Sequence, residues 1–404
     1  MRIAVIVIGN SRRGNYLNGH NLRYGNAGGS GTDTSSILVS EYLVSKGHEV
    51  VFVIDKLEPQ LEKIYKERGD TFIPGTKING VTYTYIGFEG VDNLEFDVLI
   101  NMLWFHDYES LPIKVNKSII YWSHMQWLYG AGEVVNYAEK NNLSIGIVHI
   151  SDWEKSMTNN VVTGMKNRYD NITQITIPNP VMDDMVREVL LNPPTRKSHK
   201  FVFHASWARG GNVAIEAIRQ LPFEDKELHG FDYLITIPDF SDNFFTRHNS
   251  VDKKTLFNHI AESEYFVYPL YTPYQDVHKD TFSCVVAEAI ALGCIVITYP
   301  LGALPENFND YCVWLDFPPN VDSEKMQKEA LSKDLDGKFI YTENIIQTIN
   351  NLESNPELKE KIRLNGTNYI LDKFSIDKVG EIWYDFIKQI TVWNFSILLM
   401  MRII

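Results

Sequence analysis

The segment that decides the fold reads Asp280-Thr-Phe-Ser-Cys-Val-Val-Ala-Glu288-Ala-Ile-Ala-Leu-Gly293. Its pattern predicts a helix over residues 282–292, and Glu288 is the only carboxylate between residues 281 and 305. Because successive helical residues turn by ~100°, apolar side chains surround Glu288 on every side. An ionised carboxylate in such surroundings costs several kcal/mol unless it is paired or hydrogen-bonded. The segment therefore predicts a buried acid that needs a partner.

The partner of Glu288 is not local, since no lysine or arginine lies within a turn or two of it. Three kinds of partner are open: a distant arginine, a buried water or a ligand. A vicinal diol, such as the hydroxyl pair of a ribose, would suit the carboxylate because it accepts two hydrogen bonds at once. The residues alone do not decide between these partners.

The start of the same helix forms a second candidate feature. Thr281, Phe282 and Ser283 would present unpaired backbone N–H groups there, which is the usual setting for a bound phosphate. A diol acceptor two turns inside the helix and an anion site at its start together have the dimensions of a nucleoside diphosphate. The two features together predict nucleotide binding more specifically than either one alone.

Outward from this segment, short β-branched runs alternate with helical periodicities. Strands are predicted at residues 3–8, 50–54, 82–86, 98–102, 118–122, 145–150, 172–177, 201–204, 233–237, 265–268 and 295–298. Helices are predicted at residues 35–46, 212–220, 254–262 and 282–292. Apolar strands separated by helix-length segments indicate parallel βαβ units, with sheets that are buried on both faces.

Chain length and one proline-rich segment predict two domains. At about 150 residues per domain, 404 residues give two to three domains, and two lobes are the simplest division. The segment Asn-Pro-Pro-Thr-Arg-Lys-Ser at residues 192–198 is typical of a linker. We therefore expect a first domain over residues 1–195 and a second over residues 196–375. Two facing α/β lobes form a cleft at the carboxyl ends of their strands, where such sheets bind ligands.

Composition and charge exclude several classes of protein. Apolar residues make up 44% and charged residues 22%, which excludes a disordered, a collagen-like and a multi-span membrane chain. The 38 basic and 51 acidic residues give a net charge of −13. So acidic a chain argues against nucleic-acid binding, because phosphate backbones are held by lysine and arginine.

Cysteine usage and the two ends of the sequence indicate a cytoplasmic protein. Cys284, Cys294 and Cys312 show no C-x-x-C pair and no metal-ligand spacing, so we expect buried thiols in a reducing compartment. The first apolar run leads directly into a strand and is not expected to be a signal peptide. The apolar tail at residues 390–404 is shorter than the about 20 residues a bilayer requires. A helix packed on the body and a membrane-surface segment are both open for it.

Several short segments occur in the order found in one large group of enzymes. They are residues 27–29 before a helix, residues 46–50, the strand 119–124 that ends in His124, residues 177–181, residues 203–210, residues 265–269, residues 302–306 and residues 374–375. With Asp280 and Glu288 at the acidic positions of an E-x7-E signature, this order resembles the GT-B-fold glycosyltransferases, particularly the retaining family 4. The resemblance covers most of the chain. It implies an α/β fold of two Rossmann-like parallel-sheet domains facing across a cleft, with a C-terminal helix at residues 376–404 that crosses back to complete the first domain.

The resemblance also implies roles for the matching residues. Glu288 would hold the ribose of a donor, and the backbone of Thr281, Phe282 and Ser283 would bind its diphosphate. Arg209 would neutralise the leaving diphosphate, which suits its charge and geometry. The remaining roles are these: His124 would orient the transferred sugar, Asp280 would lie beside the sugar hydroxyls or the anomeric centre, and Gly28 and Gly29 would let the backbone approach the donor. Without the resemblance, Arg209 would be interpreted as a surface arginine and His124 as an ordinary core histidine. Asp280 would be an acid at a helix N-terminus, and Gly28 and Gly29 would form a flexible turn.

Three features depart from the pattern of that family. Asp280 is one methylene shorter than the usual glutamate, so contacts to the donor sugar would differ. Residues 205–212 contain Arg209 alone, where the family has an arginine and a lysine. The segment between the first strand and the glycines is long and includes Arg12, Arg13 and Arg23. It is either an acceptor-facing loop or a plain insertion.

The implied activity is that of a hexosyltransferase-type enzyme of glycan biosynthesis. It would transfer a sugar from a nucleotide-diphosphate-sugar to a glycan, lipid or other acceptor, with retention of configuration. A sugar-nucleotide epimerase of the same fold and a non-catalytic GT-B binding scaffold are the alternatives. We expect a glycan or lipid-linked acceptor, weak peripheral membrane contact at most, and no nucleic-acid partner.

No metal and no cofactor are expected for this activity. Arg209 and the helix start near Phe282 can stabilise the departing diphosphate without a metal. The D-x-D spelling Asp334-Leu-Asp336 lies in a charged stretch and indicates a solvated loop rather than a manganese site.

Overall fold

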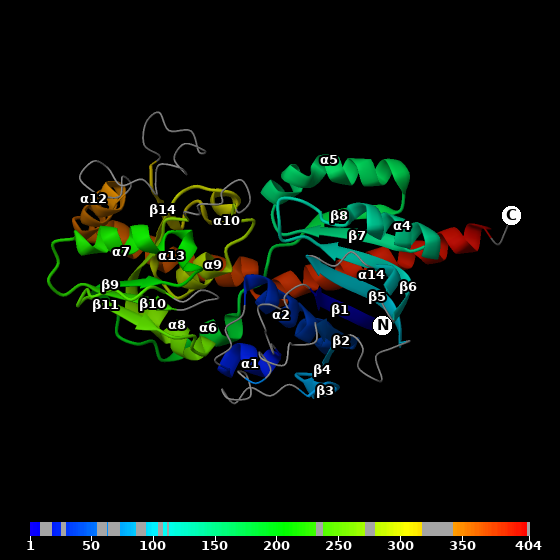
Figure 1. Ribbon diagram of the computed structural model, residues 1–404, viewed down its shortest axis with the longest axis horizontal. Coiled ribbons are helices and arrows are strands. Elements are labelled where there is room, and N and C mark those ends of the chain that lie inside the picture. Colours follow the sequence, from blue (N-terminus) through cyan, green and yellow to red (C-terminus); the bar gives the residue numbers. More distant parts are fainter. Residues whose placement is uncertain are drawn as a thin grey trace. The chain divides into compact units, whose positions relative to one another are not determined.

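The computed structural model divides the chain into two compact units (Figure 1). Unit 1 is Met1–Pro180 with Phe374–Ile404, and unit 2 is Val181–Lys373. The structure describes residues 1–8, 18–25, 30–54, 63, 73–85, 94–103, 108–110, 113–231, 237–270, 279–316 and 342–401. Gly28, Gly29, Arg12, Arg13, Asp334, Asp336 and most of the strand expected at 233–237 lie outside these segments.

Unit 1 is built on an eight-stranded sheet with the order β3-β4-β2-β1-β5-β6-β7-β8. Its strands are β1 (Arg2–Ile8), β2 (Glu49–Ile54), β3 (Thr76–Ile78), β4 (Val81–Tyr85), β5 (Leu94–Leu103), β6 (Ile113–Trp122), β7 (Ser144–His149) and β8 (Ile172–Thr176). All neighbours pair in parallel except β3 and β4, which are antiparallel. The near-continuous apolar strands are buried, as expected for a parallel sheet covered on both faces.

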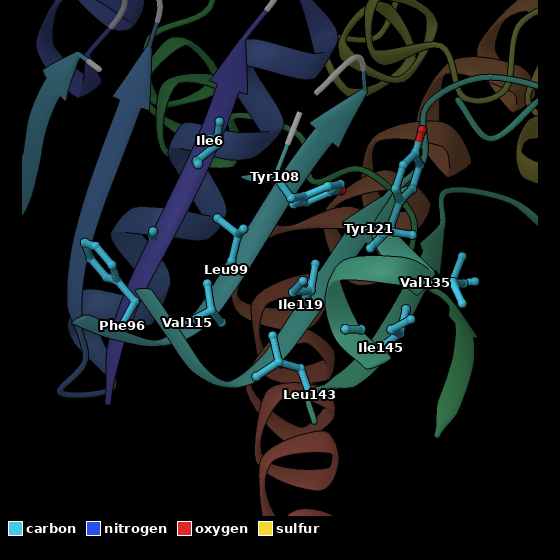
Figure 2. Close-up of a cluster of buried hydrophobic side chains, with 14 of the residues drawn as sticks. Ile6, Phe96, Leu99, Tyr108, Val115, Ile119, Tyr121, Val135, Leu143 and Ile145 are labelled. Atoms are coloured by element: carbon cyan, nitrogen blue, oxygen red, sulfur yellow. The ribbon is translucent and has the colours of Figure 1, made fainter. Parts of the chain in front are cut away.

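Helices cover both faces of this sheet. They are α1 (Gly19–Tyr24), α2 (Gly31–Ser45), α4 (Ala131–Asn141), α5 (Asp152–Arg168) and α14 (Ile376–Met401), with a short 3-10 turn η2 (Tyr108–Ser110). Figure 2 shows the core on the α4 side, a cluster of buried side chains that includes Val135 of α4 and Ile119 and Ile145 of the sheet. Gly146 points to the opposite face, where a Cβ atom would lie 3.0 Å from the ring of Phe386 in α14. A glycine at this position therefore lets α14 approach the sheet closely.

The C-terminal helix α14 is part of unit 1, as the resemblance to the GT-B glycosyltransferases implies. Its Trp383 ring packs on Trp122 at the end of β6, with 4.4 Å between ring centroids. On the outer side, the Tyr42 hydroxyl of α2 donates a hydrogen bond of 2.6 Å to Glu381. Both contacts join the end of the chain to elements formed near its beginning.

Unit 2 contains a six-stranded, fully parallel sheet with the order β11-β10-β9-β12-β13-β14. Its strands are β9 (Lys197–Phe203), β10 (Glu227–Phe231), β11 (Phe245–His248), β12 (Ser263–Tyr268), β13 (Ile295–Thr298) and β14 (Cys312–Trp314). Its helices are α6 (Asp183–Leu191), α7 (Gly211–Arg219), α8 (Lys253–Glu262), α9 (Cys284–Ala291), α10 (Leu304–Phe308), α12 (Thr342–Glu353) and α13 (Pro356–Phe374). Figure 1 shows α7 and α8 on opposite faces of the sheet.

The first unit boundary differs from the one expected at residues 195/196. The chain changes unit between Pro180 and Val181, and α6 packs against α8 inside unit 2. Arg196 explains why residues 192–198 do not form a linker: its guanidinium donates hydrogen bonds to the main-chain oxygens of Ser263 and Leu292. The proline-rich segment is therefore anchored in unit 2.

The α/β architecture of two parallel sheets is confirmed, but the four strands β3, β14, β10 and β11 were not predicted. The last two, β10 and β11, are neighbours in the sheet of unit 2. Both strands carry histidine and other polar residues, and their sequences lack the β-branched runs that identify the central strands. All three cysteines are buried and unbridged, as expected. Among the described residues, no helix has both the length and the apolar character needed to cross a membrane.

Candidate donor-binding site

The loop between β9 and α7 positions Arg209. It contains the 3-10 turn η3 (Trp207–Arg209), in which the Arg209 N–H donates to the oxygen of Ser206 at 2.8 Å. The indole N–H of Trp207 donates to Asn212 at 2.8 Å and ties the turn to the first turn of α7. These bonds fix the base of the Arg209 side chain, which is 32% exposed.

Arg209, Asp280 and Tyr268 form a closed cluster. Arg209 Nη1 donates to Asp280 Oδ1, and it also donates to the Tyr268 hydroxyl at 2.8 Å. The same hydroxyl donates to Asp280 Oδ2 at 2.9 Å. The Asp280 carboxylate raises the pKa of Arg209 further above its ordinary value, and burial raises the pKa of Tyr268. The cluster therefore holds a permanent positive charge that is one-third exposed, beside a carboxylate that is buried.

The backbone of Asp280 is held by the loop after β13. The Ala303 N–H donates a hydrogen bond of 2.8 Å to the main-chain oxygen of Asp280. Gly302 has a φ of +62°, and a Cβ atom there would lie 2.3 Å from that same oxygen. Only glycine combines this backbone conformation with so close an approach.

The start of α9 lies four residues beyond Asp280. The helix begins at Cys284, two residues later than predicted, with Ser283 as its N-cap. Ser283 makes no capping bond, and its hydroxyl is buried without a hydrogen-bond partner among the described residues. Thr281 and Phe282 are 8% and 7% exposed. The helix start therefore has a buried hydroxyl beside N–H groups of the kind that bind anions.

Glu288 has an internal partner that the sequence did not identify. Lys253 Nζ donates to both carboxylate oxygens of Glu288 at 3.0 Å, and the side chains are 10% and 1% exposed. Of the three kinds of partner left open, the structure shows a cation distant in sequence. It is a lysine and not an arginine. A ligand is therefore not required to satisfy this acid.

A signal for Lys253 was present in the sequence of α8. Lys253 shares a helix face with Leu256, Phe257 and Ile260, at the spacing of an amphipathic helix, and all four are buried. A lysine at the first position of an apolar face predicts a buried ammonium that requires a carboxylate. Only the fold shows that Glu288 supplies it.

His124 belongs to unit 1 and contacts the start of α2. It follows β6, and its Nδ1 lies 3.4 Å from the Thr32 hydroxyl in the first turn of α2. Burial lowers the pKa of His124 to about 3, so its imidazole is neutral at physiological pH. The start of α2 is fixed by a reciprocal capping box between Ser30 and Asp33. Thr32 was missed, although it follows directly on the glycine-rich segment that pointed to this helix.

The structure therefore assembles part of the predicted site and separates other parts. Within unit 2 it brings Arg209 and Asp280 together and adds Tyr268, with residues 281–283 directly following. His124 lies in unit 1 with Thr32, and Gly28 and Gly29 lie outside the described residues. Arg23, from the long first loop, forms an ion pair of 2.9 Å with Glu41. That pairing fits a structural insertion rather than a free acceptor-facing arginine.

Two parallel-sheet units and a C-terminal helix that returns to the first unit define the GT-B fold. No protein-family model matches the chain, and no curated protein sequence matches it. Solved structures match it over nearly its whole length.

Three such structures illustrate the match, and one of them is a glycosyltransferase by name. Sucrose-phosphate synthase from Thermosynechococcus elongatus is 11% identical, with a TM-score of 0.61 over 96% of this chain and 98% of the other. A glycosyltransferase from Rickettsia africae is 13% identical, with a TM-score of 0.57 over 96% and 98%. Anabaena HepE, solved with UDP-glucose, is 10% identical, with a TM-score of 0.57 over 96% and 100%. At these identities the likeness establishes the fold, whereas function depends on the site.

Proposed function

We propose that this chain is a glycosyltransferase that uses a nucleotide-diphosphate-sugar as its donor. Unit 2 binds the diphosphate at the start of α9, and Arg209 stabilises the charge that develops on it as it departs. No cofactor is needed, because the nucleotide-sugar is itself a substrate. One observation carries the proposal: a fixed, part-exposed guanidinium lies beside a helix start whose buried Ser283 hydroxyl has no partner among the described residues.

The proposed chemistry follows from these groups. Breaking the bond between sugar and diphosphate places negative charge on the leaving phosphate oxygens, while the sugar becomes oxocarbenium-like. Arg209 offers planar N–H donors to those oxygens, and the first N–H groups of α9 add the positive end of the helix dipole. Asp280 and Tyr268 keep the guanidinium in place before the donor arrives, so little reorganisation is required.

The Lys253–Glu288 pair gives the ribose proposal a specific form. Each Glu288 oxygen already accepts one bond from Lys253. A carboxylate has about four lone-pair sites in total, so two remain for ribose hydroxyls. In this proposal Lys253 orients the carboxylate, and the ribose completes it.

Retention of configuration and independence from metal are parts of the proposal that solution experiments must decide. Arg209 and the start of α9 supply positive charge where other transferases use a metal ion. His124, neutral at physiological pH, is proposed to orient the transferred sugar through hydrogen bonds. The acceptor is proposed to be a glycan or a lipid-linked sugar.

Nucleotide binding is the first test. The purified chain is scanned by thermal shift against UDP, GDP, ADP and TDP in the presence of EDTA, and again with Mg²⁺. We expect one nucleotide to raise the melting temperature by several degrees without metal. The variant Arg209→Ala should lose this shift, whereas Arg219→Ala, an exposed arginine on α7, should keep it. If no nucleotide binds, the chain is a non-catalytic scaffold and the proposal fails.

The reaction is then tested with the matching nucleotide-sugar. Without acceptor, a transferase hydrolyses the donor slowly at most, whereas an epimerase converts its sugar into the epimer. With acceptor sugars added, NMR of the product's anomeric proton decides between retention and inversion. Turnover that persists in EDTA supports the metal-independent mechanism, and turnover abolished by EDTA contradicts it.

A further inference from the structure

Unit 2 contains a cluster of three histidines that the transferase proposal does not use. His229 lies on β10, His248 on the neighbouring edge strand β11, and His259 on α8. One nitrogen from each ring lies within 4.8 Å of the corresponding nitrogens of the other two. The three side chains are only partly exposed. They are 19 and 11 residues apart in sequence, a spacing that no metal motif suggests.

The fold explains why these side chains meet. Strands β10 and β11 pair in parallel with Phe231 opposite His248, and His229 lies two residues before Phe231 on the same face. The ring of Phe231 stacks on His248 at 4.5 Å with an interplanar angle of 8°. It also contacts His259 at 5.3 Å, so one aromatic ring supports two of the three imidazoles. In Figure 1, α8 runs along this part of the sheet.

The hydrogen bonds orient one imidazole towards the others. His229 Nε2 lies 3.2 Å from Glu227 Oε2, and because a carboxylate only accepts, this nitrogen carries the proton. The other nitrogen, Nδ1, is then a lone-pair donor, and it faces His248 Nε2 at 2.8 Å. A carboxylate behind an imidazole is the usual second partner of a metal-bound histidine. The arrangement therefore presents Nδ1 of His229 as a ligand.

His259 adds an independent observation. Its Nδ1 is buried and has no hydrogen-bond partner among the described residues. A buried imidazole nitrogen without a partner loses the free energy of its hydrogen bond to water. Coordination of a cation shared with His229 and His248 would supply the missing partner.

Local charge and protonation are compatible with a bound cation. Lys200 and Lys197 lie nearby, and both pair with Glu262, while Glu227 lies behind His229. Two lysines and two glutamates leave no net positive charge to repel a metal ion. Burial lowers the pKa of His229 and of His248 to about 4 and that of His259 as well, so all three are neutral at pH 7.

We propose that His229, His248 and His259 form a binding site for a divalent transition-metal ion of the zinc class. Imidazole nitrogens are preferred ligands of Zn²⁺, Cu²⁺, Ni²⁺ and Co²⁺, and three of them leave a fourth position for water. Zinc–nitrogen bonds of about 2.1 Å place tetrahedral ligands about 3.4 Å apart, so small side-chain rotations suffice from the present geometry. The ion would join the edge strand β11 to β10 and α8. It has no step in sugar transfer.

Direct binding to the wild-type chain tests this site without any mutation. Untagged protein, stripped with EDTA and dialysed, is titrated with Zn²⁺ by calorimetry and with Co²⁺ by visible absorption. We expect saturation at one ion per chain, micromolar or tighter for Zn²⁺, and the intense visible bands of a four-coordinate Co²⁺ site. Absence of saturable binding at one ion per chain overturns the proposal.

Variants then assign the ligands. His248→Asn and His259→Gln should each weaken Zn²⁺ binding at least 100-fold, whereas His20→Gln, an exposed histidine of unit 1, should leave it unchanged. Glu227→Gln should weaken binding 10- to 100-fold, as expected for a residue that positions His229. Circular dichroism in EDTA checks that each variant is folded. If the two ligand variants fold and bind zinc as tightly as the wild type, the ion lies elsewhere and the proposal is wrong.

Discussion

Two buried carboxylates eight residues apart in unit 2 have opposite environments. Asp280 lies before α9 and forms an ion pair with Arg209, whose side chain is 32% exposed. It also accepts a hydrogen bond from the Tyr268 hydroxyl. Glu288 lies inside α9 and pairs with Lys253, and the two side chains are 1% and 10% exposed. Both acids are satisfied, but only the first pair leaves its cation within reach of solvent.

The difference shows that a buried acid is not by itself evidence of a ligand. A buried pair is costly to break, because removal of one partner leaves the other charge uncompensated in a low-dielectric interior. A partly exposed cation held by two neighbours is ready to bind an incoming anion. We therefore expect mutations at Arg209 to affect catalysis and mutations at Lys253 to affect stability.

The largest expected effect is the loss of catalysis in Arg209→Ala. Removal of one preorganised charge from a leaving-group site commonly costs about 10²- to 10³-fold in kcat. We expect a loss of that size in kcat/KM for the nucleotide-sugar that the wild type uses. Arg219→Ala on α7, whose side chain pairs with Asp242 at the surface, is the matched control and should retain wild-type rates. Equal rates in all three proteins would remove Arg209 from the mechanism.

The next effect is on stability, in Lys253→Met. It leaves the Glu288 carboxylate buried without its cation, which typically costs about 3–5 kcal/mol in the free energy of unfolding. Urea denaturation followed by circular dichroism measures it. The adjacent Lys254→Met removes an exposed pair with Glu188 and should cost less than about 1 kcal/mol.

The double variant Lys253→Met with Glu288→Leu distinguishes a purely structural pair from a ligand-binding one. Both charges are gone, so most of the lost stability should return. If Glu288 also holds the donor ribose, nucleotide binding should remain lost despite the recovered fold. Recovery of both stability and nucleotide binding would contradict the ribose proposal.

A smaller effect is expected in the pH dependence of stability through His204, beside Lys253. Burial, with the positive charge of Lys253 as the second cause, lowers the pKa of His204 to about 3. An unfolded histidine titrates near 6.5, so between pH 6.5 and 3 the unfolded chain binds a proton that the native chain does not. Stability therefore falls as the pH drops through this window, by about 1.4 kcal/mol per pH unit for one such group.

His204→Gln should reduce this acid sensitivity. Urea unfolding curves at intervals from pH 7 to pH 5 give the slope of the unfolding free energy against pH. We expect the unfolding free energy of His204→Gln to fall less steeply with decreasing pH than that of the wild type. The difference should be part of the about 1.4 kcal/mol per pH unit that one proton contributes. The exposed His20→Gln is the control, and an unchanged slope in His204→Gln would show that His204 is protonated in the native chain.

The smallest expected effect is that of Tyr268→Phe. It removes the hydroxyl that joins Arg209 to Asp280 but leaves their direct ion pair. Of the two hydrogen bonds that are lost, the one from Arg209 bears on catalysis. A hydrogen bond to a charged group contributes about 1.5 kcal/mol, so we expect about a tenfold loss in kcat/KM. A loss as large as that of Arg209→Ala would mean that Tyr268 acts on the substrate directly.

The sequence predicted the architecture well because its central strands are apolar on both faces. Runs such as β7 and β12 are buried at every residue, which only a covered parallel sheet produces. The strands β10 and β11 escaped prediction because their sequences contain charged and histidine residues in place of an apolar run. Of the two, β11 is the edge strand of the sheet and β10 is its neighbour. The boundary between the units was predicted at the wrong place because prolines indicate irregular backbone. They do not indicate which unit that backbone packs against.

The candidate site was only partly predictable for a related reason. Asp280 and Ser283 are close in sequence, so helix periodicity places them correctly. Lys253 lies 35 residues before Glu288, and Arg209 lies 71 residues before Asp280. Such pairings depend on strand order, which local patterns do not specify. The histidine cluster is of the same kind, since it forms only after β10, β11 and α8 have assembled.

The position of α14 has a consequence for biosynthesis. Its residues leave the ribosome after those of unit 2, yet Trp383 covers Trp122 in the sheet of unit 1. More than two hundred residues are synthesised between Trp122 and Trp383, and over that interval the α14-facing side of the sheet is not yet covered. Until α14 has been synthesised, Trp122 is without the aromatic side chain that packs on it, and transiently exposed apolar surface of this kind makes incomplete chains prone to aggregate.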